Sequence, residues 1–130
     1  MRVLIADDDF ISRRLMQRHL EKYATCDLAS NGSEAVEAFR LALKEDEPYD
    51  LICLDIMMPK LDGKEVLGKI RILENKKGIE NPDGVKIIMT TSISDRESVI
   101  ALKALQCDAY LVKPVSKDRL IQEVKILGLL

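Results

Sequence analysis

The stretch that decides the fold is VLIADDDF at positions 3–10, where a short apolar run ends in three consecutive aspartates. A continuous run of Val, Leu and Ile of this length is typical of a strand covered on both faces, as in a parallel sheet. Asp7, Asp8 and Asp9 repel one another, so their position at the end of such a strand needs a compensating charge. In open parallel sheets, binding and chemistry concentrate at the carboxyl ends of the strands. We therefore expect a functional site at the end of this strand.

Further apolar runs of strand length alternate with stretches of helical period along the chain. The strand candidates are residues 2–6, 26–30, 50–55, 85–90 and 109–112. The helical stripes are Ile11, Leu15 and Leu20; Ala35, Phe39 and Leu43; Val66, Ile70 and Leu73; Val99, Leu102 and Leu105; and Leu120, Val124 and Leu127. Five successive strand–helix units predict an α/β fold, a doubly wound parallel sheet with right-handed crossovers and helices on both faces.

Local signals mark helix starts and one loop. A cap residue followed three positions later by a carboxylate occurs at Asn31 with Glu34, Asp62 with Glu65, and Ser94 with Glu97. Asp9 is predicted to be a solvated charge near a helix start, without a catalytic role. The polar stretch 74–84, which contains Gly78, Pro82 and Gly84, is predicted to be a long exposed loop.

Length and composition limit the class of protein. A chain of 130 residues, 47% apolar and 32% charged, fits one compact domain. A net charge of −2 provides no basic field for a nucleic acid. The first apolar run is too short for a signal peptide and no window approaches the ~18 apolar residues of a membrane span, which predicts a cytoplasmic protein. Cys26, Cys53 and Cys107 lack metal-site or redox spacing and are predicted to be buried free thiols.

Charged and hydroxyl side chains follow four of the predicted strands. They are Asp7 and Asp8, Asp55, Thr90 and Thr91, and Lys113. Carboxylate oxygens with no His or Cys nearby favour Mg²⁺ over Zn²⁺. Mg²⁺ usually takes one or two protein carboxylates, several waters and phosphate oxygens, so a phosphoryl group is the expected further ligand.

The expected chemistry is phosphoryl transfer to a carboxylate. An Asp can attack phosphorus as a nucleophile and become an aspartyl phosphate. This reaction needs positioning and charge neutralisation, which a metal ion, a Lys and a hydroxyl around one Asp supply. The sequence has no GxxxxGK[ST] or GxGxxG loop, which argues against a nucleotide as the phosphoryl source.

Four motifs carry a resemblance to a known family: DDD at 7–9 followed by Arg13, DLICLDIMMPKLDG at 50–63, IIMTTS at 87–92 and DAYLVKP at 108–114. Over essentially its whole length, the chain resembles the receiver domain of two-component response regulators, in a stand-alone form like the chemotaxis regulators. The resemblance implies a flavodoxin-like fold with strand order 2-1-3-4-5. It also implies that residues 1–130 form a single receiver domain, and we expect no output domain.

The resemblance assigns roles at the acidic site. Asp55 is implied to be the phosphoacceptor, taking a phosphoryl group from the His of a sensor histidine kinase. Asp8 and Asp55 are implied to bind Mg²⁺ with the backbone carbonyl of Met57, and Asp7 through a water. Lys113 is implied to pair with Asp55 before transfer and with the phosphoryl oxygens afterwards.

The resemblance also implies a conformational switch. Thr91 bonds the phosphoryl group, Tyr110 moves from exposed to buried, and the Lys113–Pro114 bond is cis. The resemblance implies that the surface formed by the fourth predicted helix, strand 109–112 and the fifth helix contacts an unidentified downstream protein. Lys103, Lys117 and Arg119 are candidates for polar contacts on this surface. The domain is expected to catalyse only its own phosphorylation and dephosphorylation, and otherwise not to be an enzyme. It is expected to bind neither nucleic acid nor membrane directly, and to be a monomer or a phosphorylation-dependent dimer.

Two residues differ from those expected at a site that loses its phosphoryl group rapidly. Met57 lies two residues after Asp55 and Ile93 two after Thr91, where the family has residues beside the path of water to the phosphorus. Neither side chain can hydrogen-bond a water, and both are bulky. Ser92, where the family commonly has Ala, is still small. We therefore hypothesise a slow loss of the phosphoryl group.

Several alternatives compete with this interpretation. Thr90 is an alternative to Thr91 as the switch hydroxyl, although the family's spacing to Lys113 selects Thr91. His19 is predicted to be a surface residue, with a phosphorelay histidine as the alternative. A degenerate receiver could act as a phosphorylation-independent interaction module. A phosphatase of the haloacid dehalogenase type needs a second acid where Met57 stands. A flavin binder needs a phosphate loop where the three acids would repel phosphate.

Overall fold

The computed structural model describes residues 1–80, 82–92, 100 and 106–130. Its single sheet has five parallel strands in the order β2-β1-β3-β4-β5, as predicted. The strands are β1 (Arg2–Ala6), β2 (Thr25–Ala29), β3 (Leu51–Asp55), β4 (Lys86–Thr91) and β5 (Ala109–Val112). Each lies within one residue of its predicted bounds.

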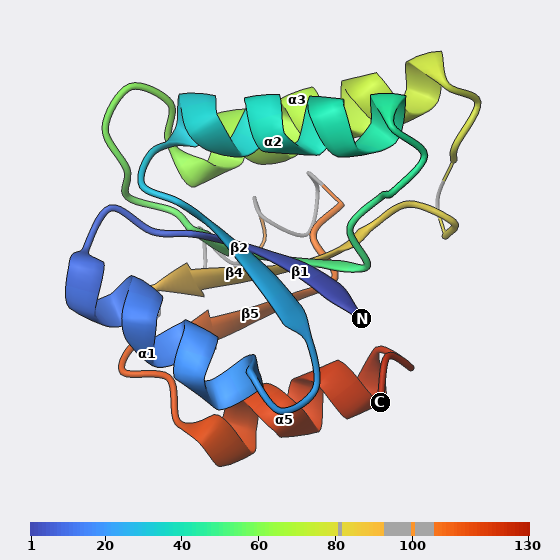
Figure 1. The fold of residues 1–130 in the computed structure, drawn as a ribbon. Coiled ribbons are helices and arrows are strands. Elements are labelled where there is room, and N and C mark those ends of the chain that lie inside the picture. Colours follow the sequence, from blue (N-terminus) through green and yellow to red (C-terminus); the bar gives the residue numbers. More distant parts are fainter. Residues whose placement is uncertain (81, 93–99, 101–105) are drawn as a thin grey trace.

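Helices cover both faces of the sheet. They are α1 (Phe10–Leu20), α2 (Gly32–Lys44), α3 (Gly63–Lys76) and α5 (Lys117–Ile126). Figure 1 shows α2 and α3 together on one face and α1 and α5 on the other. Within the described part of the chain, no helix is long and apolar enough to cross a membrane. The predicted helix with Val99, Leu102 and Leu105, including its Ser94–Glu97 cap, lies outside the described residues.

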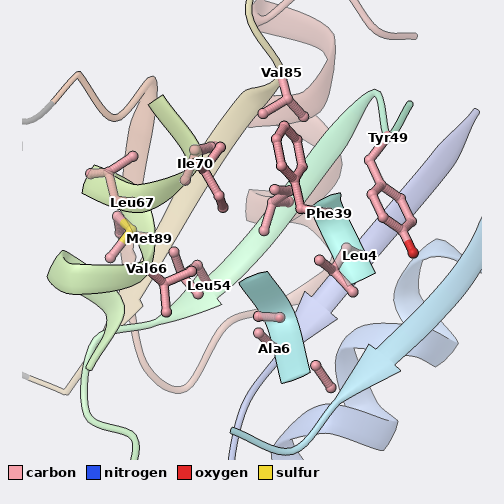
Figure 2. Packing of buried hydrophobic residues seen from close by; sticks show 14 of the residues in the cluster. Leu4, Ala6, Phe39, Tyr49, Leu54, Val66, Leu67, Ile70, Val85 and Met89 are labelled. Carbon is pink, nitrogen blue, oxygen red and sulfur yellow. The ribbon is translucent and has the colours of Figure 1, made fainter. Parts of the chain in front are cut away.

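Two apolar clusters fix the helices to the sheet. On one face, Phe39 of α2 and Val66, Leu67 and Ile70 of α3 are fully buried against β1, β3 and β4 (Figure 2). The other face contains a cluster with Met16, Leu20, Leu120 and Val124 from α1 and α5. The near-continuous Val, Ile and Leu of the central strands therefore serve both clusters, because alternate side chains point to opposite faces.

The prediction for the apolar face of α1 was wrong in part. Met16 and Leu20 are buried, whereas the exposed fractions of Ile11 and Leu15 are 74% and 45%. Residues five apart on a helix lie roughly 140° apart around its axis, while residues four apart lie roughly 40° apart. Leu20 therefore shares its buried face with Met16 and cannot also share it with Leu15.

The helix caps agree with the predictions at one position and differ at another. Asp62 and Glu65 form the reciprocal capping box that the sequence predicts for α3. Asn31 accepts a hydrogen bond from the Glu34 amide, but the Glu34 carboxylate accepts from the Ser30 amide at 2.7 Å instead of reaching back to Asn31. Asp9 proves to be the N-cap of α1, accepting a hydrogen bond from the Ser12 amide.

The predicted exposed loop 74–84 was wrong at its first residues. Helix α3 continues to Lys76, and Glu74 has only 3% of its surface exposed. Its carboxylate pairs with the Arg71 guanidinium at 2.7 Å and accepts a hydrogen bond from the Val85 amide at 2.6 Å. Arg71 also pairs with Asp108 at 3.1 Å, and Asp108 accepts from the Ile87 amide. This network ties α3 to the amino-terminal ends of β4 and β5.

The cysteine prediction holds for pairing and only partly for burial. None of the three cysteines is in a disulfide, as expected, but only Cys53 is buried. Cys26 and Cys107 are half-buried, because β2 is an edge strand and Cys107 precedes the other edge strand, β5. Burial raises the pKa of Cys53 to about 12, so this thiol stays protonated.

The buried network predicts a large stability effect from one exchange. Glu74→Ala removes one of the two carboxylate partners of Arg71 and leaves the Val85 amide without its acceptor, and we expect a loss of about 2 kcal/mol in the free energy of unfolding. Urea denaturation at pH 7 measures it. The control Glu37→Ala breaks an exposed pair with Arg40 and should change stability little. Equal effects of the two exchanges would contradict the assignment.

Candidate functional site

Three carboxylates converge at the carboxyl edge of the sheet. Asp7 follows β1 directly, Asp55 is the last residue of β3, and Asp8 lies beside them; one oxygen of each lies within 4.8 Å of the others. Asp7 and Asp55 are 3% and 5% exposed, and Asp8 is exposed. The parallel register that pairs Ala6 with Leu54 brings these strand ends together. The predicted acidic site is thus formed, with two buried members and one open to solvent.

The Lys113 ammonium lies between the two buried carboxylates. Its Nζ is 2.9 Å from Asp7 Oδ2 and 3.4 Å from Asp55 Oδ2. The resemblance implied a pairing with Asp55, but Asp7 is the nearer partner. Burial acts to lower the pKa of Lys113, yet the hydrogen bonds and charges of Asp7 and Asp55 outweigh it and raise this pKa. The side chain is therefore an ammonium at neutral pH.

The backbone around Asp7 is held by several hydrogen bonds. Its amide donates to Ala29 O at 3.1 Å, and its Oδ1 accepts from the Asp9 amide at 2.9 Å. The Arg13 guanidinium donates to Asp7 O at 2.7 Å. This role of Arg13 was missed, although its place one turn into the first helix, after the DDD motif, was the available signal.

The electrostatics of Asp55 follow from its surroundings. Burial and then the negative charge of Asp7 raise its pKa from 3.8 to about 6, even though Lys113 acts in the opposite direction. The Met57 amide donates weakly to Asp55 Oδ1 at 3.4 Å. One ammonium thus only partly compensates the two carboxylates, which leaves the cluster attractive to a further cation.

The donor set fits a magnesium ion. It consists of carboxylate oxygens, with Asp8 on the solvent side where bound waters can be retained. The loop after β3 carries Met57, whose side chain is 63% exposed, so its backbone can approach the cluster without burying the thioether. Asp7, Asp8 and Asp55 are the described carboxylates that could hold the ion.

The hydroxyl candidates lie at the end of β4. Thr90 and Thr91 are both 3% exposed, and consecutive strand residues point to opposite faces. Thr90 lines a cavity of about 270 Å³ together with Asp7 and Lys113, while the Thr91 carbonyl accepts from the Lys113 amide at 2.7 Å. Both threonines therefore lie near Lys113, and both remain candidates for the hydroxyl that contacts a phosphoryl group. Ser92 is exposed, and Ile93 lies outside the described residues.

The other predicted residues lie on or near β5. The Lys113–Pro114 peptide bond is cis, as expected. Tyr110 is half-buried and packs against the apolar cluster beneath α2 and α3. His19 is also half-buried, with Nε2 3.2 Å from Val115 O, so it links α1 to the segment after Pro114 instead of standing free on the surface. Sequence spacing gives no signal for a contact between residues so far apart.

Comparison with known proteins identifies the family. The model of the response regulator receiver domain matches residues 3–125. This chain therefore belongs to the response regulator receiver domain family, whose members act as signalling modules of two-component systems.

Individual relatives extend this result. The chemotaxis protein CheY of Halobacterium salinarum is 35% identical, over 94% of this chain and 92% of its own. ResD, a transcriptional regulatory protein of Bacillus subtilis, is 37% identical, but this chain spans only 47% of it. Probable histidine kinase 2 of rice is 29% identical, and the chain spans 12% of that protein. The receiver domain is thus shared by relatives of very different total length.

Solved structures agree with the sequence relatives. The receiver domain of the Francisella response regulator 1452 has a TM-score of 0.74 at 32% identity, covering 97% of this chain and 94% of its own. A chain from the co-crystal structure of yeast Ypd1 with the Ssk1 receiver domain gives 0.84 at 27% identity, with 98% and 88% coverage. The CheX–CheY–BeF3–Mg²⁺ complex of Borrelia burgdorferi gives 0.80 at 27% identity, with 98% and 89% coverage.

The raised pKa of Asp55 predicts a pH dependence in the metal-free protein. Between pH ~4 and ~6 the folded state holds a proton on Asp55 that the unfolded state releases, so this group's contribution to stability is largest at low pH and is lost as the pH rises through 6. Carbon-13 NMR of the carboxyl should give a midpoint near 6, with the signal assigned by its disappearance in Asp55→Asn. A midpoint near 4 would contradict the buried, Asp7-facing geometry.

Proposed function

We propose that this receiver domain is a phosphorylation switch in which Asp55 accepts a phosphoryl group from the phosphohistidine of a sensor kinase or phosphotransfer protein. The observation that carries the proposal is the position of Asp55, buried at a strand end with Asp7, Asp8 and Lys113 around it. The family match and the four motifs support the same role. A degenerate module would not need this complete set of acceptor-site residues.

The residues divide the work of transfer. A carboxylate oxygen of Asp55 attacks phosphorus, the phosphorus–nitrogen bond of the donor breaks, and the imidazole keeps the electron pair. Lys113, already 3.4 Å from Asp55, is placed to neutralise the incoming phosphoryl oxygens. Bound Mg²⁺, held by Asp8, Asp55 and the Met57 carbonyl, would supply further charge neutralisation. Thr91 is the proposed hydroxyl partner of the product.

A change at Asp55 can reach the surface through β4 and β5. Phosphorylation adds negative charge beside Lys113, whose backbone amide is bonded to the Thr91 carbonyl. Tyr110 lies three residues before Lys113 and is half-buried, so it can adopt different positions in the two states. Phosphorylation needs to favour the active state by only a few kcal/mol. We propose β5 and α5, with exposed Lys117 and Arg119, as part of the surface for a downstream protein.

Exposed apolar residues next to the site form the proposed docking surface for the donor protein. Phe10, Ile11 and Leu15 of α1 are 63%, 74% and 45% exposed, on the first helix after the acidic cluster. An exposed apolar group beside a reactive carboxylate suits a protein donor better than a small molecule. The co-crystal structure of Ypd1 with the Ssk1 receiver domain supports a phosphotransfer protein as one class of partner.

Phosphorylation of Asp55 is directly testable. Incubation with Mg²⁺ and acetyl phosphate should add one phosphoryl group to the intact mass, because the nucleophile and its neutralising groups are all present. Asp55→Asn should abolish the gain. The control Asp62→Asn keeps a capping side chain at the start of α3 and should be phosphorylated normally. No mass gain in the wild-type protein would favour the degenerate module.

The exposed Met57 side chain predicts a long phosphoryl lifetime. Its thioether cannot position a water for attack on the phosphorus, so Met57→Asn should hydrolyse about 10-fold faster or more. Decay of the phosphorylated protein, followed by intact mass after donor removal, gives the two rates. Ile72→Asn, which changes an exposed apolar residue on α3 away from the site, should decay like the wild type. A wild-type half-life of seconds would disprove slow hydrolysis.

A further inference from the structure

Gly32 lies in unusually close contact with the loop that follows β3. It is the buried first residue of α2, and a Cβ built on it would lie 2.2 Å from Leu61 O and 2.5 Å from Leu61 Cβ. Side-chain atoms do not approach a backbone oxygen this closely, so Leu61 occupies the space that any other residue at position 32 would fill. Gly68 of α3, by contrast, has no atom within 4 Å of such a Cβ.

The helix side of this contact is fixed. The Asn31 side chain caps α2 through the Glu34 amide at 2.9 Å, and the Glu34 carboxylate accepts from the Ser30 amide at 2.7 Å. Phe39, two turns further along α2, is fully buried in the cluster beneath the helix. A side chain at position 32 would therefore displace the loop at Leu61 more easily than it would displace the helix.

The loop side of the contact leads to the phosphoryl site. Residues 56–62 form a loop closed at its base by the Gly63 amide, which donates to Ile56 O at 2.8 Å. At its tip the Leu61 amide donates to Pro59 O at 2.9 Å around Lys60, whose φ is 70°. A loop fixed at both points has little slack, so a displacement of Leu61 is passed on toward Met57.

We propose that Gly32 is a positioning residue for the phosphorylation site. By leaving room for Leu61, it seats the loop 56–62 and thereby sets the place of the Met57 carbonyl beside Asp55. This inference rests on the proposed function, since it assumes that the Met57 carbonyl helps to hold Mg²⁺. Gly32 is not itself an expected ligand of Mg²⁺. It acts only through its contact with Leu61 in the loop.

The test measures Mg²⁺ binding and loop position separately from phosphorylation. Gly32→Ala should weaken Mg²⁺ binding, measured by calorimetry, about 10-fold or more. The midpoint of the Mg²⁺ dependence of acetyl phosphate labelling should rise by the same factor, with a smaller change in the rate at saturating Mg²⁺. The Met57 amide signal in metal-free NMR spectra should also shift, which a general loss of stability does not cause.

The matched control is Gly68→Ala, which adds the same methyl group to a helix without a nearby atom and should leave all three readouts unchanged. If Gly32→Ala does not fold, Leu61→Gly frees the loop from its seat while keeping Gly32, and it should weaken Mg²⁺ binding in the same direction. Wild-type Mg²⁺ affinity in the folded variant, or in Leu61→Gly where Gly32→Ala does not fold, overturns the proposal. Failure of the wild-type protein to bind Mg²⁺ or to be phosphorylated would instead overturn the proposed function.

Discussion

The position of one ammonium group between two buried carboxylates underlies the geometry of the carboxyl edge of the sheet. Two negative charges that lie within 4.8 Å of each other repel by at least ~3 kcal/mol at an effective dielectric constant of about 20, and burial adds to the cost of ionising both. Lys113 lies at 2.9 Å from Asp7 and 3.4 Å from Asp55, so its two attractions, about 5 kcal/mol each on the same scale, act against that repulsion. Three carboxylates and one ammonium still leave two negative charges, the charge that a divalent cation would balance.

At the amino-terminal edge of the sheet, two carboxylates also lie around one cation, but no open binding site is left there. Arg71 pairs with Glu74 and Asp108, the second oxygen of Glu74 accepts from the Val85 amide, and Asp108 Oδ2 also accepts from the Ile87 amide. Every buried side-chain polar atom among the described residues has a hydrogen-bond partner. The Glu74 and Asp108 carboxylates there are paired with a guanidinium and with backbone amides, whereas Asp8 at the carboxyl edge is exposed to solvent. The difference between the two edges distinguishes a structural network from a site that can bind and react.

The sequence was sufficient for features that repeat a local pattern. Continuous Val, Ile and Leu runs predicted the strands, and the rule that parallel strand ends share an edge predicted that Asp7, Asp55 and Lys113 meet. Contacts between distant residues left no such trace. Glu74 looked like the start of a polar loop because the Val85 amide that it binds lies in another segment, and His19 gave no sign of its contact with Val115.

The same limit explains why close packing around the site escaped sequence reasoning. Asn31 and Asp62 were both predicted as caps, but nothing in their spacing shows that the two helix starts stand side by side. In the structure, Gly32 after one cap meets Leu61 before the other. The starts of the two capped helices thus pack against the loop 56–62. Their backbone positions are set by the apolar cluster beneath α2 and α3, so the stability of the core and the geometry around Asp55 are coupled through glycine at one position.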